Sequence, residues 1–108
     1  MYIYNVTINI EESAHDEWRT WIETQIAVVL DTGHFMSAKF TEVLIDEEMG
    51  GKTYSVQFTA KTKEDLNAYY QFDAARIQKS GVEKFGERML SFRTELKIIN
   101  EFFPTTSH

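Results

Sequence analysis

The sequence predicts an α+β domain in which a four-stranded antiparallel sheet carries two helices on one face. Residues 2–10, 52–61 and 88–99 alternate apolar and polar side chains with the period of a β-strand. Two further segments, beginning near residues 13 and 62, repeat apolar residues with the helical period, and 36–48 is a fourth strand candidate. The resulting order is β-α-β-β-α-β, and 108 residues without an internal repeat or a linker fit one domain.

The first strand is predicted from MYIYNVTINI, which has one apolar and one largely polar face. Successive side chains of a strand point to opposite sides. Asn5, Thr7 and Asn9 therefore share a side with Ile3. The residues predicted to face the helices are Tyr2, Tyr4, Val6, Ile8 and Ile10.

The first helix is predicted to begin at a capping box formed by Ser13 and Asp16. Gly33 is predicted to end it, because glycine adopts the left-handed conformation of a helix terminus without strain. Trp21 borders the apolar stripe of this helix. The stripe itself comprises Trp18, Ile22, Ile26, Val29 and Leu30.

The second and third strands, at 36–48 and 52–61, are expected to form a hairpin through EEMGGK, which contains turn-forming glycines. The acidic run IDEEMGG is expected to be a solvated hairpin tip, since it lacks the alternating oxygen ligands of a calcium loop. In the third strand Ser55 and Gln57 alternate with apolar residues. The apolar set is Tyr54, Val56, Phe58 and Ala60.

The second helix is predicted to begin at a Thr62–Asp65 capping box and to end at Gly81. Its apolar face comprises Leu66, Tyr69, Tyr70, Ala74 and Ile77. The last strand alternates Leu90, Phe92, Thr94, Leu96 and Ile98 with Ser91, Arg93, Glu95 and Lys97, and the first of these sets is expected to face the helices. We expect residues 1–99 to form the domain, and the apolar tail at 100–108 to pack on the domain or on a partner.

The simplest topology for this order is a ferredoxin-like sheet with strand order 4-1-3-2. The polar sides of its strands would then merge on the face away from the helices, where Asn5, Thr7, Ser55, Gln57 and Arg93 are the candidate site residues. Three interpretations of this face stay open: a solvated surface, the interface of a dimer, or a site that donates hydrogen bonds to a carboxylate or phosphate.

Several stretches resemble an uncharacterised family of short bacterial proteins of unknown function: MYIYNVTINI, TGHF, TYSVQF and SFRTELKII. The resemblance covers nearly the whole chain. That family in turn is similar to the dimeric α+β barrels, in which two ferredoxin-like sheets close into one barrel. The resemblance implies a homodimer but no particular activity, because fold alone does not specify chemistry. Where this chain has Gln25-Ile26-Ala27, relatives often carry His-Ile-Pro, so no role of a histidine there transfers to it.

A second candidate site is a small apolar pocket on the helix side of the sheet, where Trp21, His34 and Tyr70 could present polar tips. The alternative is the ordinary edge of an amphipathic core. Some proteins of the barrel group are cofactor-independent monooxygenases or isomerases, and this pocket would suit such an enzyme.

Composition argues against several partners and cofactors. The net charge of −6 disfavours nucleic acid, and no apolar run is long enough for a membrane span or a signal peptide. The absence of cysteine fits a cytoplasmic location. His15 and His34 bracket the first helix, about 25 Å apart at 1.5 Å per residue, so no shared metal site is expected and no cofactor is predicted.

Two functions are therefore expected from the sequence. The first is a homodimeric small-molecule-binding or interaction domain without an assigned activity. The second is a monooxygenase- or isomerase-like enzyme that uses the helix-side pocket. The residues do not decide whether the protein is an enzyme.

Overall fold

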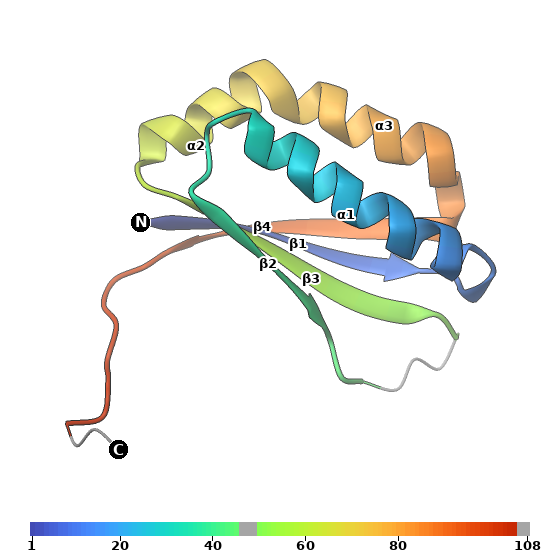
Figure 1. The fold of residues 1–108 in the computed structure, drawn as a ribbon, viewed down its shortest axis with the longest axis horizontal. Coiled ribbons are helices and arrows are strands. Elements are labelled where there is room, and N and C mark those ends of the chain that lie inside the picture. The colour runs from blue at the N-terminus through green and yellow to red at the C-terminus, as the bar shows by residue number, and fades with distance from the viewer. Residues whose placement is uncertain (46–49, 106–108) are drawn as a thin grey trace.

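The computed structural model describes residues 1–45 and 50–105 and has two layers, a twisted sheet beneath a pair of helical rods (Figure 1). The antiparallel sheet has the order β2-β3-β1-β4, so the predicted topology is confirmed. Its strands are β1 (Tyr2–Ile10), β2 (Ser37–Glu42), β3 (Lys52–Ala60) and β4 (Met89–Lys97).

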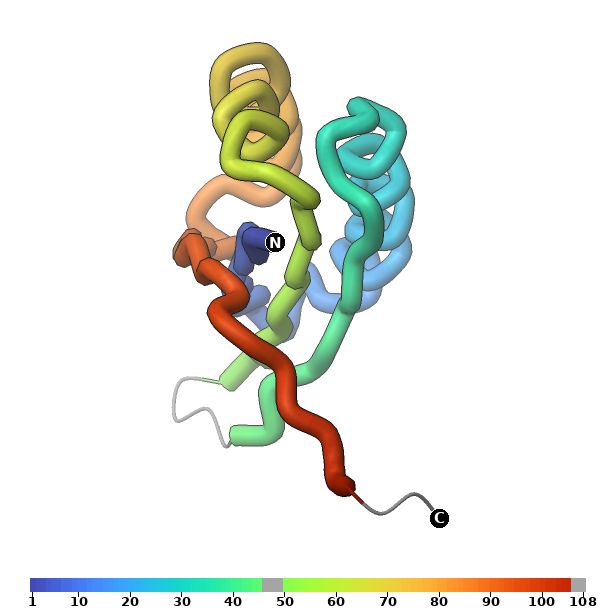
Figure 2. The backbone as a smooth tube through the Cα atoms, turned by 90° about the vertical axis from the view of Figure 1, so that its left-hand side faces the viewer, coloured from blue at the N-terminus to red at the C-terminus, as the bar shows by residue number. Residues whose placement is uncertain are grey.

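Both helical rods cover the same face of the sheet, side by side (Figure 2). The first is α1 (His15–Asp31), which follows the short 3₁₀ turn η1 (Glu12–Ala14). The second is one continuous rod made of α2 (Lys63–Tyr69), the π-helical turn η2 (Tyr70–Ala74) and α3 (Ala75–Phe85). The 3₁₀ turn η3 (Gly86–Arg88) then leads into β4. We call the uncovered side of the sheet the open face.

Two of the predicted helix boundaries are confirmed. The backbone N–H of Asp65 donates to Thr62 Oγ1 at 3.1 Å, which is the predicted cap of α2. Gly33 follows α1 with a φ of 83°, the left-handed conformation expected there. Polar capping chemistry and glycine placement are local properties, which explains why the sequence reveals them.

The other two predicted boundaries are wrong. Ser13 does not cap α1, because its hydroxyl donates to Glu11 Oε2 at 3.0 Å and the chain enters the helix through η1. Gly81 does not end the second rod, which continues to Phe85 and stops where Gly86 has a φ of 55°. Gly81 lies buried inside α3, so its small size serves packing rather than termination.

The core fills the space between the helices and the sheet. Trp18, Ile10 and Leu66 are fully buried, and an aromatic group surrounds Tyr4, whose ring centroid lies 5.4 Å from that of Tyr69. Aromatic rings also link Tyr4 to Phe35 and Phe58, each at 6.1 Å. The predicted apolar faces of β1 and β3 are thus the inner faces of the domain.

The orientation of β4 is opposite to the prediction. Residues directly opposite each other in an antiparallel pair share a side of the sheet. Val6 faces Arg93 and Thr7 faces Phe92, so Arg93 lies on the helix side and Phe92 on the open face. Met89 sets this register, because it packs into the core opposite Ile10 and the alternation then turns Leu90 outward.

Two predicted features lie partly beyond the described residues. The predicted second strand and the tip of its hairpin include 46–49, which are outside the described part of the chain. Within that part β2 ends at Glu42. The predicted tail is described as far as residue 105. It leaves the end of β4 and descends on the open side of the sheet (Figure 1). None of the described helices is long and apolar enough to cross a bilayer.

Candidate functional site

The central strands of the open face carry a group of hydrogen-bonded amides and hydroxyls. Ser55 Oγ donates to Asn5 Oδ1 at 2.6 Å, and Asn5 Nδ2 donates to Thr7 Oγ1 at 3.1 Å. Asn9 Nδ2 donates to Thr53 Oγ1 at 3.2 Å, and Gln57 lies directly opposite Asn5. The structure therefore brings Asn5, Thr7, Ser55 and Gln57 together as predicted. The oxygen and the nitrogen of the Asn5 side-chain amide are thus both already hydrogen-bonded within the sheet.

An apolar row runs beside this polar group on the edge strand. Leu90, Phe92 and Leu96, which we call the β4 row, lie opposite Asn9, Thr7 and Ile3. Their exposed fractions are 55%, 66% and 43%. The open face is thus polar in the middle and apolar along one side, where the sequence had indicated a polar face throughout. Thr94 interrupts the row between Phe92 and Leu96. Several exposed large apolar side chains along one strand are nevertheless typical of interaction surfaces.

The helix side contains a cavity of about 70 Å³ between α1, α3 and the sheet. Its walls are mostly apolar and include Ile22, Ile26 and Val29 of α1, Ile77 of α3 and Val6 of β1. A site of this size holds about five to seven water-sized positions, since one buried water occupies roughly 10–15 Å³ on this measure. Trp21, one of the predicted pocket residues, lines it.

Polar groups line the cavity on both its sheet side and its helix side. Arg93 Nε donates to the buried hydroxyl of Tyr4 at 3.0 Å, and both residues line the cavity together with Ser91. Gln25 on α1 reaches across to α3, where its Nε2 donates to the backbone oxygen of Ile77 at 3.0 Å. Arg93 therefore belongs to this site and not to the open face.

Gly81 opens the end of the cavity between α1 and α3. A Cβ at this position would lie 2.9 Å from Met89 Cε and 3.2 Å from Trp21 Cη2. The bare backbone therefore lets Trp21 and Met89 pack against α3. This packing is the role of the glycine that the sequence had indicated as a helix terminus.

Tyr69 and Tyr70 occupy different environments next to the cavity. Tyr69 is buried, and its burial raises the pKa of its phenol well above the usual value. Tyr70 is about one third exposed, and its ring lies edge-on to that of Tyr4, with 5.6 Å between the ring centroids. Burial, followed by the charge of Glu95, raises the pKa of Tyr70 to about 12. Both tyrosines stay neutral near pH 7 and can donate a hydrogen bond there.

His34 lies apart from the cavity, in a polar cluster at the π-helical turn. Its Nε2 lies 2.8 Å from Asp73 Oδ2, and Arg76 donates to Asp73 Oδ1 at 2.6 Å. The hydrogen bond from His34, supported by Arg76, holds the pKa of Asp73 below its usual value. Of the predicted pocket trio, Trp21 alone is a wall of the cavity, whereas His34 and Tyr70 stand outside it.

Replacing Asp73 with asparagine should destabilise the protein in a pH-dependent way. A carboxyl whose pKa is lowered by folding stabilises the protein above its unfolded pKa, and this stabilisation is lost as the pH falls through the folded pKa. The unfolding free energy of Asp73→Asn should therefore lie below that of the wild type at pH 7. The two should converge as the pH falls below 3.8, the ordinary value of this group.

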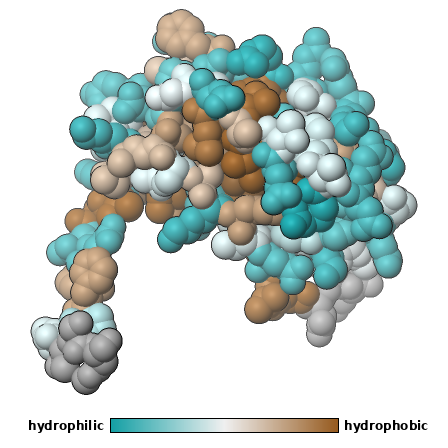
Figure 3. Space-filling view, in the orientation of Figure 1, coloured by the Kyte–Doolittle hydropathy of each residue, from teal (hydrophilic) through white to brown (hydrophobic). Residues whose placement is uncertain are grey.

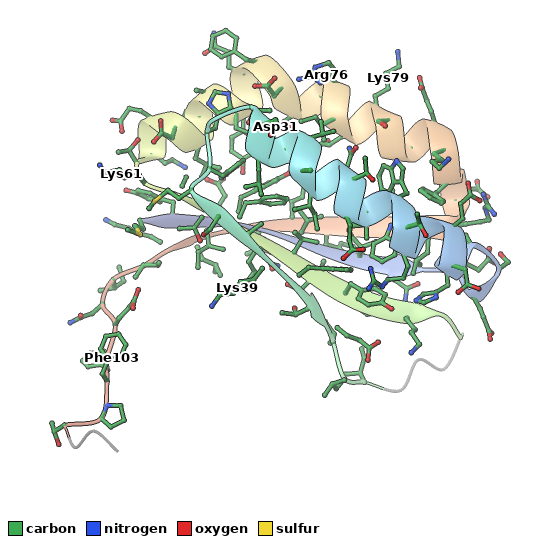
Figure 4. The ribbon with its side chains drawn as sticks, viewed as in Figure 1. Asp31, Lys39, Lys61, Arg76, Lys79 and Phe103 are labelled. Atoms are coloured by element: carbon green, nitrogen blue, oxygen red, sulfur yellow. The ribbon has the colours of Figure 1, made fainter. Side chains whose placement is uncertain are left out.

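Urea unfolding between pH 2.5 and 7 measures this difference. Asp31→Asn is the matched control, because Asp31 is an exposed aspartate at the end of α1 (Figure 4). If the unfolding free energies of wild type and Asp73→Asn differed by the same amount at every pH, the lowered pKa of Asp73 in the folded protein would be contradicted.

Comparison with known families gives the chain its classification. The model of DUF4286, a domain of unknown function, matches residues 1–99. The chain belongs to this family. The DUF4286 domain thus includes all four strands and both helical rods. No curated protein matches the chain.

Solved structures similar to this DUF4286 chain show its ferredoxin-like fold. A dimeric ferredoxin-like protein from an uncultured marine organism has a TM-score of 0.73 and 8% identity, and the match covers 94% of this chain and 97% of that one. A proposed antibiotic biosynthesis monooxygenase from Deinococcus radiodurans has a TM-score of 0.62 and 6% identity, over 98% and 100% of the chains. A de novo designed protein with a ferredoxin fold has a TM-score of 0.52 and 14% identity, and the match covers 100% of this chain and 96% of that one.

Sequence reasoning missed two features of these sites. It placed the β4 row toward the helices and Arg93 on the open face, because apolar residues of an amphipathic strand usually face the core. The signal that could have corrected this is the adjacent pair Met89-Leu90, in which both residues are apolar and the register is ambiguous. If Met89 is taken as the core residue, the alternation of β4 places Arg93 on the helix side as well, where it can meet Tyr4.

Proposed function

We propose that this DUF4286 protein is a homodimer that binds a small apolar acid in the cavity between its helices and its sheet. The observation that carries the ligand part is the pair of Arg93 and Tyr4 at one side of a mostly apolar cavity. A guanidinium group and a phenol are both donors suited to a carboxylate. The apolar walls suit a short hydrocarbon part.

The geometry leaves donors available for such a ligand. Arg93 uses Nε toward Tyr4, and among the described residues its terminal nitrogens make no ion pair. The Tyr4 hydroxyl accepts from Arg93, so its own hydrogen can point toward the cavity. A carboxylate between these groups would receive charge-assisted hydrogen bonds.

The dimer part of the proposal is supported by the open face. The β4 row leaves three large apolar side chains in solvent beside a polar group that already satisfies part of its own hydrogen bonds. A second copy packed on this face would cover both. The dimeric ferredoxin-like neighbour is consistent with that arrangement, at the level of fold.

The ligand proposal is tested with short carboxylates of four to eight carbons, such as isobutyrate and benzoate. We expect them to raise the melting temperature of the wild type and to give saturable binding in calorimetry. Arg93→Gln should weaken binding by about tenfold or more, since a charge-assisted hydrogen bond contributes roughly 1.5–3 kcal/mol. Arg88→Gln, an exposed arginine outside the cavity, is the control.

Equal binding by wild type and Arg93→Gln would refute the role of Arg93. The absence of binding by every carboxylate would refute the ligand class. Light scattering on the same variants adds a second readout. Because Arg93 lies on the helix side, Arg93→Gln should leave the mass in solution unchanged.

A second candidate function is an enzyme with the chemistry of a cofactor-independent monooxygenase or an isomerase. The observation that favours it is the Tyr4 hydroxyl beside Arg93, because such a donor pair can stabilise an enolate oxygen. Incubation with a short ketone or keto acid in D₂O separates the two functions. Accelerated exchange of the hydrogens next to the carbonyl indicates the enzyme, and binding without exchange indicates the binding domain.

A further inference from the structure

We propose that the C-terminal arm (residues 99–105) packs onto a second copy of the chain, against the apolar corner formed by Val43, Leu44 and Ile45 at the end of β2. The proposal rests on the homodimer proposed above and specifies how its two copies hold each other. It would bury the exposed apolar side chains of the arm and of the corner in one contact between the two copies.

The arm is apolar and stands away from its own domain. A backbone hydrogen bond from Ile98 N to Met1 O, at 2.9 Å, holds the chain where it leaves the sheet. Beyond that point Ile99, Phe102 and Phe103 have exposed fractions of 83%, 86% and 77%. Figure 4 shows the Phe103 side chain on the descending tail, away from the sheet. Two phenylalanines with this exposure are strong candidates for burial in an interface.

The receiving corner is apolar and has a defined backbone. Leu44 and Ile45 are 86% and 59% exposed. The N–H of Val43 donates to Thr53 O at 2.8 Å, which holds the corner against β3. An open hollow of about 560 Å³ lies beside these residues and is also lined by Gly51 and Lys52. The hollow offers room for aromatic rings.

The arm is too short to reach the corner of its own copy. Lys97 and Ala60 both pair with Tyr2 at one end of β1, whereas Lys52 pairs with Ile10 at the other. Eight steps along a strand span about 26 Å. The chain from residue 98 to 103 extends at most about 18 Å. Phe102 and Phe103 would therefore fall short of their own corner.

The arm and the corner both project on the open side of the sheet, at opposite ends (Figure 1). The space-filling view shows the arm extending away from the body, and a small hydrophobic patch at the lower edge of the body (Figure 3). A two-fold axis between two facing sheets can bring the arm of one copy beside the corner of the other. The symmetry then repeats the same contact a second time.

Cross-linking between differently labelled copies tests this contact directly. The chain contains no cysteine, so single cysteines report without background. We would mix Phe103→Cys with Leu44→Cys and oxidise the mixture. A covalent dimer should form in high yield from the mixture. Phe72→Cys in place of Phe103→Cys is the control, because Phe72 is exposed on the helical layer.

A second measurement gives the contribution of the arm. The double substitution of Phe102 and Phe103 by serine should raise the dissociation constant of the dimer by roughly 10- to 100-fold, because two aromatic side chains per copy are lost from the contact. Phe72→Ser should leave it unchanged. Since the arm stands outside the folded core, the double variant should keep the melting temperature of the isolated protomer.

The outcomes separate the two proposals. A wild-type dimer that neither cross-links at these positions nor weakens in the double variant overturns the arm contact and leaves the dimer standing. A wild-type monomer at all concentrations overturns both. Efficient cross-linking together with weakened association supports the arm contact.

Discussion

Replacing Phe92 with aspartate is expected to dissociate the proposed dimer. Phe92 is the middle member of the β4 row and is 66% exposed on the open face. A carboxylate there would lose its hydration in an apolar contact, and a two-fold interface carries the change twice. We expect the dissociation constant to rise by at least about 100-fold, which corresponds to roughly 2.8 kcal/mol. Sedimentation velocity over a concentration series measures it.

Phe72→Asp is the matched control for this prediction. Phe72 has an exposed fraction of 67%, almost equal to that of Phe92, but belongs to the π-helical turn on the opposite layer. The two variants therefore place the same charge on equally exposed positions. Retention of the dimer by Phe92→Asp, or equal weakening by both variants, would show that the open face is not the interface.

Replacing Gly51 with alanine is expected to destabilise the fold far more than the same change at Gly50. Both glycines have positive φ, at 80° and 78°, so alanine is strained at either position. At Gly51 a Cβ would also lie 2.5 Å from the backbone oxygen of Ile10, whereas at Gly50 it would meet nothing within 4 Å. The atoms that this Cβ would meet belong to the backbone of Ile10 and Glu11, so no flexible side chain can move aside to make room for it.

We expect Gly50→Ala to cost about 1 kcal/mol of unfolding free energy and Gly51→Ala about 3 kcal/mol or more. Urea unfolding of the two variants measures the difference. Similar losses in both would mean that β3 shifts away from Ile10 at little cost. The end of β1 would then tolerate displacement.

Residue patterning predicted the elements and their order, but not every orientation. The alternation in β1 and β3 is unambiguous, because apolar residues occupy one side of each strand almost without exception. In β4 the alternation alone allows two orientations. The choice depends on where Met89 fits between Ile10 and Gly81, which is a tertiary contact that no local pattern contains.

The candidate sites follow the same division. The group around Asn5 and Gln57 could be predicted, because it depends only on strand periodicity and on the pairing of β1 with β3. The pairing of Arg93 with Tyr4 could not, because it depends on the orientation of β4. His34 was associated with Tyr70 by sequence, yet it bonds Asp73 on the next turn.

The π-helical turn in the second rod has a consequence for how related sequences should be aligned. A π turn accommodates one residue more than an α turn, and one residue corresponds to about 100° of rotation around the helix. Removing one position between Tyr70 and Ala74 would convert the π turn into an ordinary α turn and leave Leu66 in the core, because the wider turn already absorbs the extra residue. Family members that lack this residue should therefore keep the apolar faces of α2 and α3 and should align with a one-residue gap at the turn.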